Sequence, residues 1–246
     1  QNGAWLHAPD TELLRRLMAA SEGLVKLVSL APEEPGAMEF IEAVSGEVTV
    51  SLGHTTADYD TAMRAFAAGA RQVTHLFNAM PPLNHREPGV IGAALDTPAC
   101  MAELICDGVH IHPAVVRAAF RLFGAERMLL VSDTMRAAGM PDGQYTLGGQ
   151  EVIVRGSTAT LADGTLAGSV TDLMSCMKLA VSMGIPLADA VTAAAVNPAK
   201  VLGIYNRVGS LEPGKLANFC ILDESLSLKA VVFRGGQVVL SNGSAS

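Results

Sequence analysis

Short apolar segments alternate with alanine-rich segments through the first half of the chain, and this alternation constrains the fold more than any other feature. The alanine-rich segments have helical spacing, as in 58–70 and 112–125, and Gly69 and Gly124 stand where glycines end helices. Strands and helices that alternate about every 25 residues form parallel βαβ units, and continuous hydrophobicity is typical of strands covered on both faces. We therefore predict a parallel α/β sheet. Its five strands are LVKLVSL (24–30), EVTVSL (47–52), QVTHLF (72–77), MAELIC (101–106) and RMLLVS (127–132).

The pattern changes after residue 140. Segment 141–166 contains the pairs Asp142-Gly143, Gly148-Gly149 and Asp163-Gly164, which favour hairpin turns. Helical spacing returns at 170–183 and 187–196, and 214–240 alternates like antiparallel strands around Gly235-Gly236. We predict an α/β body over 1–205 with a β-hairpin insertion near 141–166, followed by a small β part over 206–246.

Size and charge exclude several classes of function. A chain of 246 residues buries enough surface for one α/β domain and a small appendage. The net charge of −7 argues against nucleic acid as a partner. The apolar segments fall short of the roughly 20 residues that span a bilayer, and no signal peptide is found, so no membrane association is expected. Four cysteines without disulfide or metal-site spacing indicate reduced thiols in a cytoplasmic protein: Cys100, Cys106, Cys176 and Cys220.

Polar residues stand at or just beyond the end of every predicted strand. They are Glu33, His54, His75, Asn78, Asp107, His110 and Asp133. In parallel α/β folds the carboxyl ends of the strands meet at one rim, where catalytic groups collect. The shared position predicts one functional site on that rim.

The residue types favour metal-assisted hydrolysis. Neutral imidazoles on neighbouring strands suit one or two divalent metal ions, Zn²⁺ or Fe²⁺, and leave a position for a water whose pKa falls toward about 7. Asp133 is suited to take a proton from water and return it to a leaving amine. His110 is suited to stabilise the developing oxyanion. No G-x-S-x-G motif supports a serine hydrolase, and the glycine pairs lie in hairpins rather than in a dinucleotide-binding turn.

Each of these residues also has an ordinary structural interpretation, and the sequence leaves it open. The alternatives are a loop histidine for His54, a hydrogen-bonded core histidine for His75, a helix cap for Asp133, an introduction to the next helix for His110 and His112, and an exposed ion pair for Arg86 and Glu87.

Eight motifs resemble the N-acetylglucosamine-6-phosphate deacetylase family of the amidohydrolase superfamily, in the order of that family. H-L-F-N-A-M with H-R-E-P-G, and D-G-T-L-A-G-S, are peculiar to this family among its relatives. The matching segments are SLAPE (29–33), LGHTTA (52–57), THLFNAMPPLNHREPG (74–89), CDGVHIHP (106–113), LLVSDTMRAAGMPDGQYTLGG (129–149), DGTLAGS (163–169), NPAK (197–200) and GSLEPGKLANFCILD (209–223).

The resemblance implies a (β/α)₈ barrel with a small β-sandwich, a cytoplasmic homodimer, and metal-dependent removal of the acetyl group from a 6-phosphorylated amino sugar. His54 and His75 would be metal ligands and Asp133 the general base and acid. The implied substrate-binding residues are Asn78, Ala79, Arg86, Asp107, His110, Leu166, Ala167, Gly168 and Ser169. Arg86 would hold the phosphate, because a dianion in an acidic protein needs a fixed cation and a guanidinium suits it best.

The start of the chain departs from the family pattern. The family's H-x-H pair and the metal-binding Glu of its E-G-P motif do not occur, Trp5 stands at the position of a frequent histidine, and Glu33 belongs to a different strand from the missing ligand. Two histidines alone bind metal weakly, and five strands leave a barrel with two open edges. We therefore expect a fragment of a longer deacetylase with little activity by itself. The rival interpretations are an amidohydrolase acting on a cyclic amide or nucleobase, and a non-catalytic remnant that binds a phosphosugar.

Overall fold

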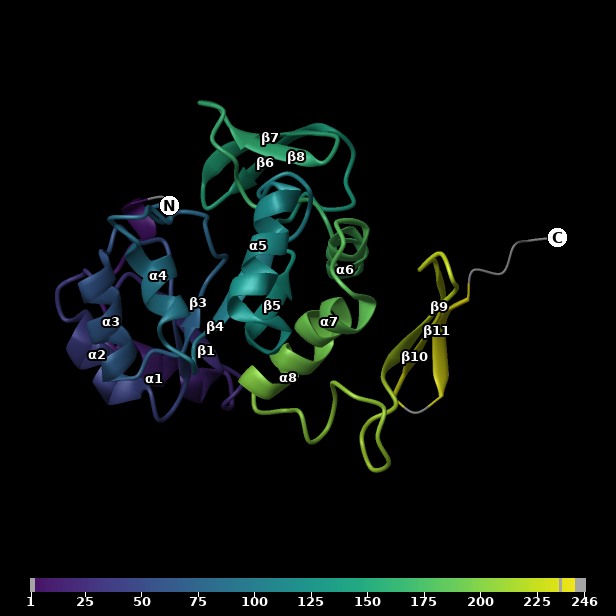
Figure 1. Cartoon of the computed structure of the whole chain (residues 1–246), viewed down its shortest axis with the longest axis horizontal. Coiled ribbons are helices and arrows are strands. Elements are labelled where there is room, and N and C mark those ends of the chain that lie inside the picture. The colour runs from purple at the N-terminus through teal and green to yellow at the C-terminus, as the bar shows by residue number, and fades with distance from the viewer. Residues whose placement is uncertain (1–2, 235, 242–246) are drawn as a thin grey trace. The chain divides into compact units, whose positions relative to one another are not determined.

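The computed structural model describes residues 3–234 and 236–241 (Figure 1). They form two compact units, with the boundary between residues 194 and 195. The division predicted at 205/206, which assigns a barrel domain and a sandwich domain, stays a prediction.

A parallel sheet of five strands forms the centre of the first unit. Its strands follow the order β1-β2-β3-β4-β5, so each strand pairs with its neighbours in the sequence. Right-handed crossovers between such strands place the connecting helices on the same side of the sheet, as in a sector of a (β/α) barrel. The predicted α/β class is confirmed, although the described strands leave the sheet open at β1 and β5. The bounds are β1 (Leu27–Leu30), β2 (Thr49–Leu52), β3 (Gln72–Val73), β4 (Met101–Ile105) and β5 (Met128–Val131).

Helices connect the strands, and two of them begin and end at the predicted signals. Asp58 caps α3 with its side chain, and Gly69 ends it at a φ of 129°. His112 caps α5 by accepting a hydrogen bond from the first turn, so this histidine does introduce the helix. None of the described helices has the length and apolar character to cross a membrane. The helices of this part are α1 (Thr11–Ala20), α2 (Ala37–Val44), α3 (Tyr59–Ala68), α4 (Gly89–Leu95) and α5 (Pro113–Phe123), with 3₁₀ turns at Gly3–Trp5 (η1) and Ala125–Arg127 (η2).

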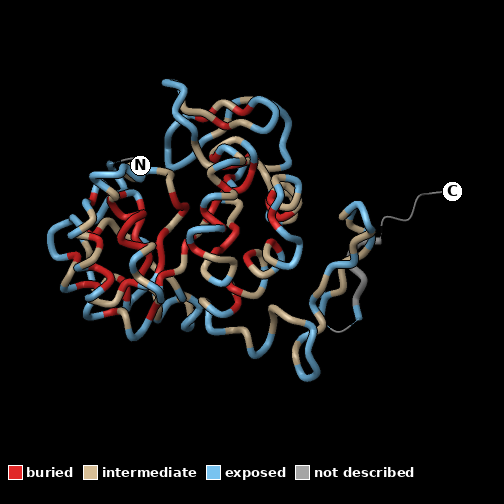
Figure 2. The backbone as a smooth tube through the Cα atoms, viewed as in Figure 1, coloured by how far each residue is buried: buried red, intermediate tan, exposed pale blue. Residues whose placement is uncertain are grey.

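The core of the first unit lies between the sheet and these helices, along the buried stretches of Figure 2. Val50 and Leu52 of β2, Leu104 of β4 and Ile41 of α2 are fully buried. Burial of each such side chain contributes about 1.5–3 kcal/mol, so the core holds the strand ends in fixed positions.

The third strand is shorter than predicted. The sequence indicated a strand over 72–77, but β3 ends at Val73 and its ladder to β2 stops there. His75 and Phe77 have positive φ angles of 31° and 74°, which no strand accommodates. His75 therefore lies in the turn after the strand and not within it.

A small antiparallel sheet follows, with strands β6 (Gly143–Leu147), β7 (Gln150–Arg155) and β8 (Thr158–Leu161). Gly148 and Gly149 both have positive φ, as the predicted β6–β7 turn requires. Asp142-Gly143 is not a turn, because Gly143 pairs with Val154 and begins β6. The sheet packs on the chain that follows β5 through Met135, Ala137, Val152, Val154 and Ala159.

After this sheet, the predicted helices 170–183 and 187–196 appear as α6 (Leu173–Ser182) and as α7 (Leu187–Val191) continued by a π-helical turn at Thr192–Val196 (η3). The second unit contains α8 (Asn197–Val201) and an antiparallel sheet of β9 (Phe219–Leu222), β10 (Leu228–Phe233) and β11 (Gln237–Ser241). These strands confirm the antiparallel prediction for 214–240, whereas Gly235 of the predicted turn lies outside the described residues. The Lys215 ammonium stands 3.4 Å from the centroid of the Tyr205 ring and orders the chain before β9.

The burial pattern predicts that stability depends on the sheet core rather than on the outer helix faces. Leu104→Ala removes a fully buried side chain from β4, and we expect it to lower the free energy of unfolding by about 2–5 kcal/mol. Leu122→Ala, at a position on α5 that is 52% exposed, is the matched control and should change it by less than about 0.5 kcal/mol. Urea denaturation followed by circular dichroism measures both, and equal losses would contradict this assignment of the core.

Candidate functional site

The turns that follow the parallel strands share a strained backbone. Eight non-glycine residues have positive φ, and five of them lie in the turns after β2, β3 and β5: His54, His75, Phe77, Ala79 and Asp133. Each such residue costs on the order of 1–3 kcal/mol, and strain of this kind collects at functional sites. Four of these five residues are predicted site residues, so an independent property of the backbone points to the same rim.

His54 and His75 meet at this rim. Their Nε2 atoms are 2.8 Å apart, and their rings form an edge-to-face pair with an interplanar angle of 83°. His75 is 6% exposed, whereas His54 is exposed. At 2.8 Å one Nε2 carries a hydrogen and the other accepts it, so the accepting nitrogen carries no proton. Partial shielding from water lowers the pKa of His54, and the adjacent His75 lowers it further.

The donor chemistry of this pair fits a divalent metal. The Nε2 atoms of two imidazole rings lie 2.8 Å apart, and Nδ1 of His75 is buried without a hydrogen-bond partner. Because Nδ1 is buried, Nε2 is the ring nitrogen of His75 that is available for coordination. Within the described residues, no group of three or more His, Cys, Asp or Glu side chains is placed to hold a metal ion.

Glu33, at the end of β1, is used differently from what its position in the sequence indicated. Its carboxylate accepts hydrogen bonds from the Thr55 hydroxyl and the Thr56 backbone N–H, both at 2.5 Å, and from the Thr56 hydroxyl at 3.1 Å. Partial burial opposes ionisation of Glu33, but these hydrogen bonds outweigh it and lower its pKa. Both carboxylate oxygens are occupied, so Glu33 holds the loop that carries His54.

The turn after His75 ties the second and third loops together. The Asn78 side chain donates to the carbonyl oxygens of His75 and Leu76, both at 3.3 Å. The carbonyl oxygen of Ala79 accepts the Thr55 N–H at 3.0 Å. Asn78 and Ala79, predicted to bind substrate, therefore lie beside the two histidines and fix their separation.

Glu103 is a partly buried acid near this site that sequence analysis missed. It projects from β4, where it accepts the Gln72 side-chain amide at 2.5 Å and the His75 N–H at 3.3 Å. Burial raises the pKa of Glu103, and the negative charge of Asp133 raises it further. The signal available in the sequence was a glutamate in the middle of the apolar segment MAELIC. Glu103 thus holds the backbone of His75 by accepting its N–H.

His110 forms a buried pair with Asp107 in the loop after β4. Its Nδ1 lies 2.6 Å from Oδ2 of Asp107, and its Nε2 lies 3.0 Å from the carbonyl oxygen of Ala167. The hydrogen bond to Asp107 raises the pKa of His110 despite burial. Burial opposes ionisation of Asp107, but its bonds to His110 and to the backbone lower its pKa.

The segment Leu166–Ser169 lies directly against Asp133. The Ser169 N–H donates to the Asp133 carbonyl oxygen at 2.8 Å, and the Met135 N–H donates to the Ser169 carbonyl oxygen at 2.9 Å. A Cβ atom on Gly168 would stand 3.0 Å from the Asp133 carbonyl oxygen, so glycine permits this approach. Segments about 35 residues apart in the sequence therefore form one wall of the site.

Arg86 lies apart from these contacts on the proline-rich loop. The residue is exposed, its backbone N–H donates to the Asn84 side chain at 2.9 Å, and within the described chain it makes no ion pair with Glu87. The guanidinium is therefore free to bind an anion.

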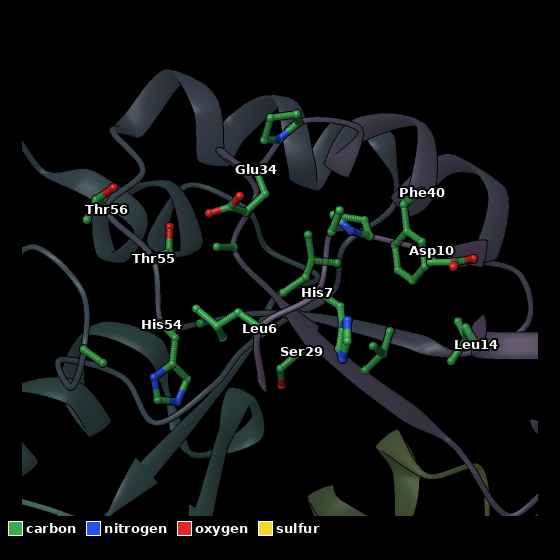
Figure 3. Close-up of a pocket in the computed structure, with 18 of the residues that line it drawn as sticks. Leu6, His7, Asp10, Leu14, Ser29, Glu34, Phe40, His54, Thr55 and Thr56 are labelled. Carbon is green, nitrogen blue, oxygen red and sulfur yellow. The ribbon is translucent and has the colours of Figure 1, made fainter. Parts of the chain in front are cut away.

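A pocket of about 1020 Å³ opens beside His54 (Figure 3). Leu6 and His7 of segment 6–10 line this pocket together with His54 and Thr55. Ser29 of β1 lies on the floor. The pocket leaves space for a ligand next to His54.

Comparison with known proteins identifies the family. The model of the amidohydrolase family matches residues 7–242. This chain belongs to the amidohydrolase family. The predicted resemblance is confirmed by an N-acetylglucosamine-6-phosphate deacetylase of Bacillus subtilis (strain 168), which is 41% identical over 239 residues, covering 96% of this chain and 60% of that protein.

Two further proteins extend the likeness. An N-acetylgalactosamine-6-phosphate deacetylase of Escherichia coli O157:H7 is 40% identical, covering 90% of this amidohydrolase chain and 59% of the relative. The structure of a mutant N-acetyl-D-glucosamine-6-phosphate deacetylase of Mycobacterium smegmatis, in complex with N-acetyl-D-glucosamine-6-phosphate, has a TM-score of 0.92 at 38% identity, covering 98% of this chain and 64% of that one. The chain spans about 60% of the length of the curated relatives it matches.

The contacts of Glu33 predict a local effect that needs no ligand. Glu33→Ala removes the acceptor of the Thr56 N–H, and hydrogen bonds to charged groups contribute about 1.5–3 kcal/mol. We expect hydrogen exchange of the Thr56 amide to accelerate about tenfold or more. Glu34→Ala, at the exposed neighbouring residue, is the matched control and should leave the rate unchanged. Similar rates in both variants would show that Glu33 does not hold the His54 loop.

Proposed function

We propose that this protein hydrolyses the acetamide bond of N-acetyl-D-glucosamine 6-phosphate and releases acetate and D-glucosamine 6-phosphate, a step of amino-sugar breakdown. The observation that carries the proposal is the meeting of the His54 and His75 Nε2 atoms at 2.8 Å on the rim that also bears Asp133 and His110. The names of the B. subtilis and M. smegmatis relatives support this substrate.

A metal ion is part of the proposal. Amidohydrolases are generally metal-dependent, and we propose one or two Zn²⁺ or Fe²⁺ ions with His54 and His75 as ligands. Such an ion, when held by these two residues, would supply Lewis-acid chemistry for the amide carbonyl and for a water molecule. Two hydrogen bonds hold the backbone of His75: its N–H donates to the Glu103 carboxylate, and its carbonyl oxygen accepts the Asn78 side-chain amide.

Asp133 carries the proton transfer. Its carboxylate removes a proton from the attacking water, whose oxygen forms the new bond to the carbonyl carbon, and delivers that proton to the nitrogen as the C–N bond breaks. The charge of Asp133 acts on the ring of His54, which supports its place beside the histidine pair. His110 donates a hydrogen bond to the oxyanion that forms on the carbonyl oxygen.

The phosphate is assigned to Arg86. In a protein of net charge −7 the overall field repels a dianion, so a local cation must hold it. The Arg86 guanidinium is exposed and, within the described chain, forms no ion pair. We also propose a cytoplasmic homodimer and a sugar pocket formed by Leu166, Ala167, Gly168 and Ser169, both of which the family resemblance implies.

The acid–base role of Asp133 is tested with the natural full-length protein supplied with zinc. We expect Asp133→Asn to lower the release of acetate from N-acetylglucosamine 6-phosphate by about 10²–10⁴-fold or more, because the amide does not accept the proton. Calorimetry should find substrate affinity retained. Asp60→Asn, at an exposed aspartate of α3, is the control and should keep full activity.

Retention of most of the rate in Asp133→Asn would refute the assignment. N-acetylgalactosamine 6-phosphate, assayed in parallel, tests the alternative hexosamine in the name of the E. coli relative. Acetate release from neither sugar by the wild-type protein would refute the proposed function and favour a phosphosugar-binding remnant or an amidohydrolase with another substrate.

The phosphate role of Arg86 predicts a selective loss. Arg86→Ala should raise KM for the phosphorylated sugar about tenfold or more, since a charge-assisted contact contributes about 1.5–3 kcal/mol. KM for unphosphorylated N-acetylglucosamine should not change. Arg121→Ala, on the exposed face of α5, controls for the loss of one positive charge. Equal effects on both sugars would remove Arg86 from the phosphate site.

A further inference from the structure

We propose that Asp107 is a positioning residue that holds His110 as a doubly protonated hydrogen-bond donor, and is not itself a contact of the substrate. The role within catalysis rests on the proposed function, whereas the protonation of His110 follows from the geometry of the pair.

Both ring nitrogens of His110 face groups that only accept hydrogen bonds. Nδ1 lies 2.6 Å from a carboxylate oxygen of Asp107, and Nε2 lies 3.0 Å from the carbonyl oxygen of Ala167. A neutral imidazole carries one N–H and would turn a lone pair toward one of these oxygens. Only the imidazolium satisfies both contacts.

Asp107 has no free oxygen to offer a ligand. Oδ2 faces the His110 ring, and Oδ1 accepts the backbone N–H groups of Val109 and His110, both at 2.9 Å. The Asp107 side chain is 2% exposed and that of His110 is 7% exposed. The predicted contact of Asp107 with substrate is therefore replaced by a structural one, which fixes both the position and the charge of His110.

Among the described residues, the groups that act on His110 favour the imidazolium, whereas burial opposes it. The groups that act on His110 are Asp107, the Ala167 carbonyl and Asp133, and all three favour its protonated form. The thiols that lie near Asp107 are neutral, because burial raises the pKa of Cys106 to about 12 and that of Cys176 to about 11. Within the described residues, this loop is thus built to keep one positive charge on His110.

The positive charge on His110 makes its Nε2–H a permanent hydrogen-bond donor. An imidazolium keeps its Nε2–H whatever happens at Nδ1, so His110 presents a fixed donor on the side of the Leu166–Ser169 segment. The Ala167 carbonyl is its partner in the described structure. An acyl oxygen that develops negative charge is a stronger acceptor than a neutral carbonyl, and it would replace the Ala167 carbonyl as the partner of this N–H.

The test is a pH titration of His110 in the natural full-length protein, followed by NMR of the ring Cε1–H. The signal is assigned by its loss in His110→Gln. We expect His110 in the wild type to titrate well above the ordinary value of about 6.5. In Asp107→Asn the apparent pKa should fall by at least one unit, which is a tenfold weaker preference for the proton. Asp107→Glu should restore most of the difference, and Asp96→Asn, at an exposed aspartate, should leave it unchanged.

The pKa shifts of His110 and Asp107 make the stability of the fold depend on pH. The pKa of His110 is raised in the folded state, so His110 stabilises the fold at low pH, and this stabilisation is lost as the pH rises through the folded-state pKa. The pKa of Asp107 is lowered in the folded state, so Asp107 stabilises the fold above its unfolded-state pKa, and this stabilisation is lost as the pH falls through the folded-state pKa. The pair is therefore strongest between the two folded-state values. In Asp107→Asn the alkaline limb of kcat for acetate release should move to lower pH, while KM changes little.

A wild-type His110 that titrates near its ordinary value would overturn the proposal, even if Asp107→Asn does not fold. An unchanged His110 pKa in a folded Asp107→Asn would also overturn it. A high His110 pKa in a wild-type protein that releases no acetate would support the paired geometry and refute the proposed function, so the two failures are distinguishable.

Discussion

The parallel register of β1 to β5 is the constraint on which the rest of the site depends. Because every strand runs in the same direction, each one delivers its next residues to the same rim, and a turn of ordinary geometry would scatter them. Positive φ angles at His54, His75 and Asp133 redirect the chain at once, at a cost on the order of 1–3 kcal/mol each. The fully buried side chains of the sheet core offset that cost, as do the contacts that Glu33 and Ala79 make with the His54 loop.

The polar groups of this rim fall into two electrostatic environments. The contact between His54 and His75 needs an unprotonated acceptor nitrogen, and the pKa of His54 is lowered, which suits the pair to a cation. His110 is held positive by Asp107, which suits it to an anion or a developing oxyanion. His75 and His110, which follow the neighbouring strands β3 and β4, therefore have opposite electrostatic roles. What separates them is the acceptor on the far side of each ring: His75 Nδ1 has none, whereas His110 Nδ1 has a carboxylate.

Sequence periodicity predicted the five strands and the helices α3, α5, α6 and α7, because each buries a continuous apolar face, a property that local composition records. It failed at QVTHLF because an apolar turn has the same composition as an apolar strand, and only the tertiary contacts of His75 show that the chain leaves the ladder at Val73. The strand-end position predicted which residues gather at the rim. It did not predict which of them contact each other: Glu33 binds a loop and not a ligand, and Asp107 binds His110. These choices depend on distances between loops far apart in the sequence, which no local pattern records.

The glycines of the motifs set the distances that the polar residues require. A Cβ atom on Gly53 would stand 2.7 Å from Cβ of Thr74, closer than such atoms approach, so glycine lets the end of β2 pass against the residue before His75. Because His54 directly follows Gly53, a larger residue there would push apart the two backbones that bring the Nε2 atoms within 2.8 Å. The hydroxyl of Thr74 is in turn fixed by Ser51 and Ser29, at 2.6 and 2.9 Å, so the neighbouring backbone has little freedom to yield. The glycine of L-G-H is thus a steric requirement of the histidine pair, in the same way that Gly168 is a requirement of the wall beside Asp133.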